Sequence, residues 1–123
     1  MNNFQKEASQ YDLSSLIKLQ NKRKENVAIF ECSISNERAA SQQEEIAQLA
    51  LEKKLKFHDL SISILDDTEK ELILADIPKL KVTREKREQT VMLLKAAILE
   101  EHAMMDREEQ MISFLETRNG SKE

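Results

Sequence analysis

A seven-residue repeat in the last third of the chain is the feature that most limits its fold. Counting by sevens from Ile77, the first and fourth positions of the repeat recur without a gap to Leu115, and most of them are apolar. Apolar residues at alternating three- and four-residue steps form a stripe along one face of an α-helix. The repeat therefore predicts a helix that pairs with another helix along a seam, whose apolar members are Ile77, Leu80, Val91, Leu94, Ile98, Met105, Ile112 and Leu115.

The remaining positions of this seam are charged, and they are Arg84, Arg87, Glu101 and Glu108. An unpaired buried charge is costly, so each should meet an opposite charge or lie at a hydrated section of the seam. Two copies packed antiparallel about residue 96 would set Arg84 against Glu108 but Arg87 against Met105. We therefore interpret these charges as positions that select the partner, and a partner of another sequence or a shifted frame remains an alternative to self-pairing.

Two earlier segments have the same spacing and predict further helix. The first places Leu13, Leu16, Val27, Phe30 and Ile34 in one frame with Gln20 and Arg23, and the second places Leu51, Leu55, His58, Ile62, Leu65 and Leu72 in one frame with Glu69. The predicted helical region covers residues 13–117. Residues 1–12 and 118–123 are predicted to be flexible tails, because the first has few apolar anchors and the second has an Asn-Gly pair that stops helices.

Three candidate breaks interrupt this region, at 33–43, 66–68 and 76–78. In the first, the apolar pattern lapses, and Ser41 and Glu44 have the spacing of a capping box, although the local composition fits an uninterrupted helix equally well. Thr68 and Glu71 have the same spacing in the second. Pro78 either begins a new helix or kinks a continuous one, because proline lacks the amide hydrogen that a helix interior uses.

The composition supports the all-α class. The 123 residues include one glycine and one proline, too few for the turns that a sheet protein needs. We predict long helices that form a coiled coil or an elongated helical hairpin or bundle. The net charge is −4 with both signs interleaved along the chain, which argues against nucleic acid as a partner.

No motif in the sequence carries chemistry. The single glycine, Gly120, lies near the C-terminus, so no glycine-rich phosphate loop is present. His58, His102 and Cys32 are far apart in sequence and do not form a ligand pair for zinc. We therefore expect no catalytic residues, no cofactor and no metal site. A single cysteine and the absence of an apolar stretch long enough to span a membrane predict an intracellular protein, cytoplasmic or nuclear.

These patterns favour a non-enzymatic scaffold subunit that assembles with protein partners through helix pairing, as a homo- or hetero-oligomer. The alternative is a compact three-helix adaptor, with helices near 13–36, 41–66 and 76–117, that docks a segment of a partner. In texture the whole chain looks like the small helical subunits of cytoskeletal or chromosome-segregation complexes, such as augmin or kinetochore assemblies. That likeness implies a setting and assigns no role to any residue.

Overall fold

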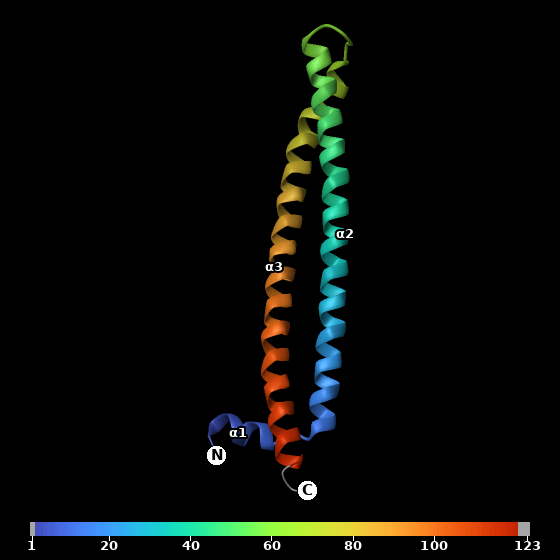
Figure 1. The fold of residues 1–123 in the computed structure, drawn as a ribbon. Coiled ribbons are helices and arrows are strands. Elements are labelled where there is room, and N and C mark those ends of the chain that lie inside the picture. Colours follow the sequence, from blue (N-terminus) through green and yellow to red (C-terminus); the bar gives the residue numbers. More distant parts are fainter. Residues whose placement is uncertain (1, 121–123) are drawn as a thin grey trace. The chain divides into compact units, whose positions relative to one another are not determined.

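The computed structural model describes residues 2–120, and all regular secondary structure within them is helical. Helix α1 covers Asn3–Ser9, α2 covers Leu13–Asp59 and α3 covers Asp67–Gly120 (Figure 1). Helices α2 and α3 pack against each other as the two arms of a hairpin. The predicted all-α class is confirmed.

Helix α1 lies where the sequence suggested a flexible tail. Its first turn is closed by a capping box: the Asn2 side chain accepts a hydrogen bond from the Gln5 amide at 2.8 Å, and the Gln5 side chain accepts one from the Asn2 amide at 3.2 Å. Reciprocal bonds of this kind satisfy two amide groups that a helix start otherwise leaves unpaired. Helix α1 also buries Ala8 fully against the longer helices.

Aspartate residues begin both long helices. The Asp12 carboxylate accepts a bond from the Ser15 amide at 2.6 Å, and the Asp66 carboxylate accepts one from the Glu69 amide at 2.8 Å. The predicted break at 66–68 is therefore a helix start, but its capping residue is Asp66, two positions before Thr68.

Helix α2 ends in a turn that reverses the chain. Ser61 has a positive φ of 60°, its amide bonds to the carbonyl of His58, and the Ile62 amide bonds to the carbonyl of Phe57. This pairing is a Schellman motif, which usually has glycine at the position that Ser61 occupies. Because α2 ends at Asp59, the second predicted segment does not continue through Ile62 and Leu72, which are 66% and 59% exposed.

The other two candidate breaks lie inside helices. Helix α2 continues through 33–43, and Pro78 is inside α3 with no new helix starting at it. The separate helices expected at 13–36 and 41–66 for a three-helix bundle are thus a single helix. Pro78 is exposed, so its ring adds no packing that would offset the hydrogen bond it cannot donate.

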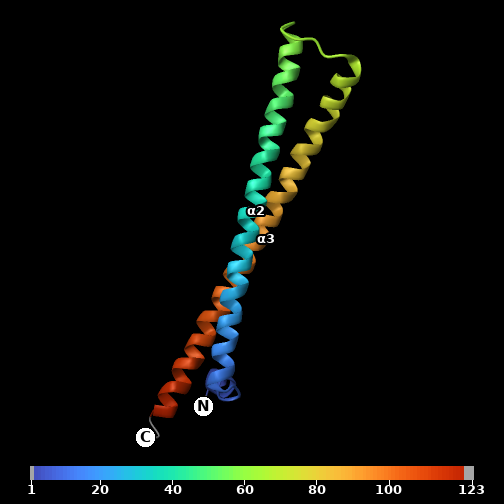
Figure 2. The ribbon, with the colours of Figure 1, turned by 90° about the vertical axis from the view of Figure 1, so that its right-hand side faces the viewer.

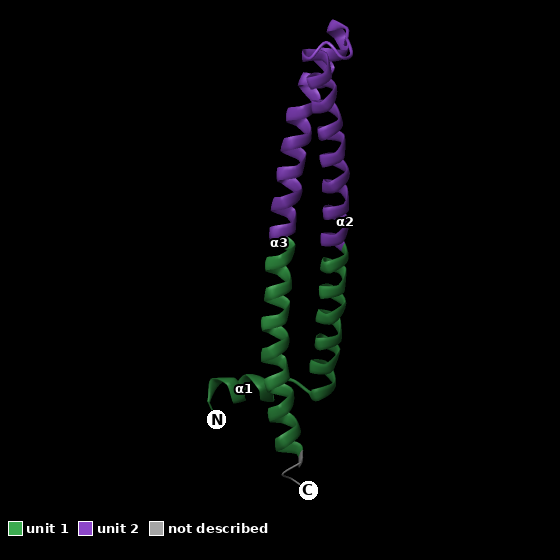
Figure 3. Ribbon diagram, turned by 45° about the horizontal axis from the view of Figure 1, so that its top comes forward, with its two compact units in different colours: residues 1–32, 94–123 green, residues 33–93 purple. Residues whose placement is uncertain are grey.

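The chain divides into two compact units (Figure 3). Unit 1 comprises residues 1–32 and 94–123, and its described part contains α1, the beginning of α2 and the end of α3. Its core is a cluster of apolar side chains in which α1 closes the space beside the two longer helices. The members are Ala8, Leu16, Met111, Ile112 and Leu115, with Phe4, Leu13 and Phe114 packed around them.

Unit 2 comprises residues 33–93, an antiparallel hairpin made of the end of α2 and the beginning of α3. The segment that joins its two arms is visible at the upper end of Figure 2. The buried apolar residues of this unit are Ile34, Ile73 and Val91, and polar side chains occupy much of the space between its arms. Unit 2 is therefore held less by apolar burial than unit 1.

Candidate functional site: the seam and the outward faces

The seam on α3 faces α2 of the same chain. None of its twelve predicted positions is exposed, and Val91, Glu108 and Leu115 are 3%, 5% and 7% exposed. Side chains from α2 contact this face in unit 1 and in unit 2. The sequence predicts that the apolar stripe of α3 pairs with another helix, and in the structure α2 of the same chain covers it.

The matching face of α2 keeps one frame from Leu13 to His58. Its positions between Ile34 and Leu51 are polar, and they are Glu37, Ser41, Glu44 and Gln48, of which none is exposed. This lapse in apolar residues is the candidate break predicted at 33–43, but α2 is continuous across it. The signal that could have identified it is the unchanged seven-residue spacing across the lapse, with polar residues that match the arginines of α3.

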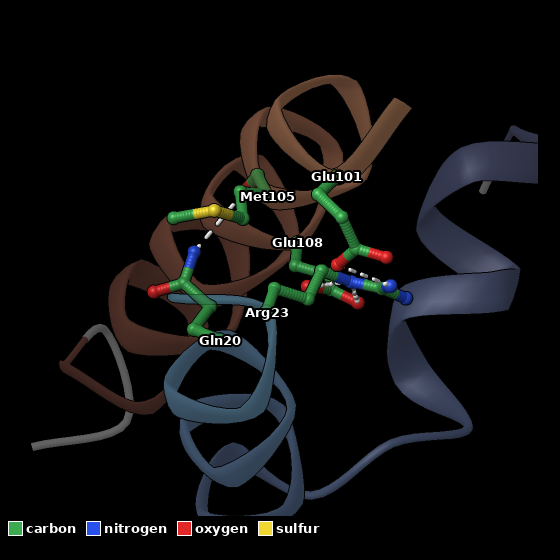
Figure 4. A network of polar contacts seen from close by, with 5 residues as sticks. All are labelled: Gln20, Arg23, Glu101, Met105 and Glu108. Carbon is green, nitrogen blue, oxygen red and sulfur yellow. Dashed lines mark hydrogen bonds and ion pairs between the residues drawn. The ribbon is translucent and has the colours of Figure 1, made fainter. Parts of the chain in front are cut away.

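Arg23 of α2 is the centre of the polar section in unit 1 (Figure 4). Its Nε lies 2.9 Å from the Glu108 carboxylate and its Nη1 lies 3.3 Å from Glu101. Gln20, one turn earlier, donates to the carbonyl oxygen of Met105 at 3.1 Å. The side chain of Glu108 is 7% exposed and those of Arg23 and Glu101 are below 20%. Two of the charged seam residues thus have a partner on α2.

Two opposed effects set the pKa of Arg23. Burial acts to lower the pKa, but the hydrogen bonds from Glu108 and Glu101 and their negative charges outweigh it, so the net pKa is raised above the usual arginine value. Arg23 stays charged at every physiological pH. The cluster therefore carries one positive and two negative charges and acts as a permanent ionic contact between α2 and α3 within unit 1.

Arg84 and Arg87 make the corresponding contacts in unit 2. Arg84 donates to Gln48 at 3.0 Å and lies 3.6 Å from Glu45. Arg87 binds two carboxylates of α2, Glu44 and Glu37, the second at 3.1 Å. The hydrogen bond to Glu44, followed by that to Glu37, raises the pKa of Arg87 above its usual value.

This section of the seam is not fully satisfied. Nε of Arg84 and Oε2 of Glu44 are buried and have no hydrogen-bond partner among the described residues. A buried polar atom without a partner lowers stability. These two atoms therefore offset part of the stability that the ion pairs of unit 2 contribute.

All four charged seam residues have partners within the chain. Each of these contacts lies inside unit 1 or inside unit 2. Antiparallel pairing of two copies about residue 96, with Arg84 against Glu108, would require these contacts to be broken. The geometry instead matches each charge with its opposite, or with an amide, on the other arm of the hairpin.

The residues weighed for chemistry lie apart. His58 is at the end of α2, where its Nδ1 accepts a bond from the Leu65 amide at 3.1 Å and so holds the connecting segment. His102 and Cys32 are exposed on helix surfaces. Within residues 2–120, no group of three or more histidine, cysteine, aspartate or glutamate side chains is arranged to hold a metal ion.

The outward faces carry much apolar surface. Sixteen large apolar side chains among the described residues are exposed. Single exposed apolar residues are normal on soluble proteins, but groups of them mark interaction surfaces. One group surrounds the connection between α2 and α3, where Leu60, Ile62 and Ile64 are 59%, 66% and 85% exposed.

Comparison with protein-family models, curated proteins and solved structures gives no match to this chain. In the described part of the chain, no helix combines the length and apolar character needed to cross a membrane.

Proposed function

We propose that this protein is a non-enzymatic structural subunit, a preformed helical hairpin that binds other proteins on its outward faces. The observation that carries the proposal is the set of sixteen large apolar side chains that are exposed among the described residues. Exposed apolar groups of this kind are costly in water unless another molecule covers them.

The contacts of the seam support this assignment of surfaces. The predicted seam of α3 already has α2 as its partner, and its charges are matched inside the chain. A partner that used the seam would have to separate the two helices first. Binding on the outward faces needs no such opening, so partners can bind while α2 and α3 stay paired within each unit.

The composition of the chain and its likeness to small helical subunits suggest a cellular compartment and a kind of complex. A single exposed cysteine suits a reducing, intracellular compartment. The likeness of the chain to small helical subunits points to a multi-protein complex of the cytoskeletal or chromosome-segregation type.

Isolation of the tagged chain from its native cells tests the proposal, with identification and quantification of the proteins that co-purify. We compare the wild type with a variant of the outward face of α3 in unit 2, Met92→Gln with Leu93→Gln; these two side chains are 64% and 72% exposed. We expect stoichiometric partners for the wild type and their loss from the variant.

A matched control separates loss of binding from loss of folding. Lys95→Gln changes an exposed side chain on the same helix without removing apolar surface. It should retain the partners, and far-ultraviolet circular dichroism should show the same helix content for all three proteins. If the same proteins co-purify with the double variant, or if no protein co-purifies with the wild type, the proposal is refuted.

A further inference from the structure

The segment that connects α2 to α3 presents apolar side chains to water in an ordered arrangement. Leu60, Ile62 and Ile64 alternate with serines, and Ile64 is the most exposed large apolar residue described, at 85%. We call Leu60, Ile62 and Ile64 the apolar tip. Exposed apolar residues this close together at a loop have no structural role in the fold of unit 2, since none of them joins its buried residues.

The backbone of this segment is fixed by hydrogen bonds to α2. The amides of residues 60–63 donate to the carbonyls of Lys56, Phe57 and His58 at 2.9–3.3 Å, and the Leu65 amide donates to His58 Nδ1. The cap formed by Asp66 then begins α3. A binding surface that is already ordered loses less conformational entropy when a partner arrives. The tip is therefore preorganised for contact.

The two arms beside the tip carry opposite charge. The last seven residues of α2, 53–59, contain three lysines and one aspartate, so their formal charge is 3 − 1 = +2. Residues 66–71 contain four acidic residues and one lysine, so their formal charge is 1 − 4 = −3. All of these side chains are exposed except that of Lys70, which is partly buried.

Helix dipoles explain part of this distribution. Acidic residues at a helix start and basic residues at a helix end are each favourable within one helix. The helix dipole accounts for the basic residues at the end of α2 and the acidic residues at the start of α3, but it does not explain why the apolar tip is exposed. A surface with a basic side, an acidic side and an apolar centre is, in addition, complementary to itself.

We propose that the apolar tip is a self-association site, whose occupant is the tip of a second copy of this chain. A two-fold axis perpendicular to the plane of the two arms sets the basic arm of one copy against the acidic arm of the other. The other end-on two-fold arrangement would oppose like charges. The charges thus select the first arrangement, and Leu60, Ile62 and Ile64 of both copies fill the centre.

The contact between two tips is small, so we expect a weak affinity. It involves one loop and the adjoining helix turns of each copy, which places it with the weak, reversible interfaces. Its electrostatic part should weaken as salt screens the charges. The inference deepens the proposed function, on which it rests, by naming one partner: two scaffold subunits would be joined at their tips.

Sedimentation equilibrium of the full chain tests the inference, at about 10 µM to about 1 mM protein and at salt concentrations from about 50 mM to about 500 mM. We expect a monomer–dimer equilibrium that weakens as salt rises. Ile64→Ser should raise the dissociation constant at least about tenfold. The matched control Ile29→Ser, on α2 in unit 1, removes another exposed isoleucine and should leave the constant unchanged.

A charge exchange gives the sharper test. One variant carries Lys53→Glu, Lys54→Glu and Lys56→Glu, and the other carries Asp67→Lys, Glu69→Lys and Glu71→Lys. Each should be monomeric alone, because both arms of its tip then carry the same sign, and a mixture of the two should form a 1:1 dimer. Circular dichroism of each variant checks that the helices are retained.

Several results would overturn the inference. They are a wild type that stays monomeric to about 1 mM, a dimer that Ile64→Ser does not weaken, and a mixture of the charge variants that does not associate. Co-sedimentation with vesicles of phosphatidylcholine and phosphatidylserine tests a lipid as the occupant, and binding of monomeric protein through Ile64 would also overturn it. None of these results removes the outward face of α3 as a binding surface, so the proposed function is judged separately.

Discussion

The ionic cluster of unit 1 allows a quantitative test of how the polar seam contributes to stability. Arg23→Met removes the cation that pairs with both Glu101 and Glu108. Exposed ion pairs contribute about 0–1 kcal/mol, whereas breaking a buried pair costs about 3–5 kcal/mol because a charge stays buried without a partner. The Glu108 side chain is 7% exposed and that of Glu101 is 17%, so we expect a loss of about 2–4 kcal/mol.

The triple variant Arg23→Met, Glu101→Leu, Glu108→Leu separates the cost of an unpaired charge from the value of the contact. Removing all three charges leaves an apolar section, which in other proteins is neutral or more stable. We expect its stability to return to within about 1 kcal/mol of the wild type, or to exceed it. Arg107→Met is the matched control, because its pair with Glu7 is exposed and should cost less than about 1 kcal/mol.

Urea unfolding followed by far-ultraviolet circular dichroism measures these differences. Hydrogen exchange of peptides from α3 in unit 1 locates them, because the two compact units can unfold at different urea concentrations. A loss below about 1 kcal/mol for Arg23→Met would refute the reasoning. A triple variant no more stable than the single variant would refute it as well, because the cost would then not come from unpaired carboxylates.

Three further predictions concern local structure. Pro78→Ala should stabilise α3 by up to about 3 kcal/mol, measured by urea unfolding, because it restores a hydrogen bond in the helix interior and removes no buried surface. Ser61→Gly should stabilise the turn by about 0.5–1 kcal/mol, because glycine adopts a positive φ without strain, whereas Ser63→Gly in the same segment should not stabilise it. The hydrogen bond from Ser15 holds the pKa of Asp12 below its usual value, so the capping contribution is present above the unfolded pKa and is lost as the pH falls through the folded pKa. The protection factor of the Ser15 amide should therefore fall below about pH 4 in the wild type but show no such step in Asp12→Asn.

The fold class could be predicted from spacing and composition because both act locally. A chain with one glycine and one proline cannot make the turns of a sheet, and its apolar residues recur at helical steps. The aspartates before α2 and α3 have the chemistry that begins a helix, although the capping role of Asp66 was assigned to Thr68. The turn at Ser61 was missed because serine is not the residue that usually takes a positive φ.

The continuity of the helices could not be predicted from the same signals. Within 33–43 the lapse in apolar residues resembled a break, but Glu37 and Glu44 are contacts for Arg87, which lies far along the chain. Pro78 lies inside α3, with helical turns on both sides of it. The hydrogen bonds and packing of those turns offset the hydrogen bond that Pro78 cannot donate. Helix α1 was also missed, because it is stabilised by burial of Ala8 and Phe4 against residues near the other end of the chain.

The sequence by itself determined that the chain is helical, where its apolar stripes run and which seam positions carry charge. These properties follow from the chemistry of neighbouring residues and from the helical repeat. The tertiary structure alone decided which helix covers the stripe of α3. Many helices could bury the same apolar residues at similar free energy, but α2 also brings Arg23 to Glu108 and Glu44 to Arg87 and so pairs these charges. Those pairs join residues that are far apart in sequence.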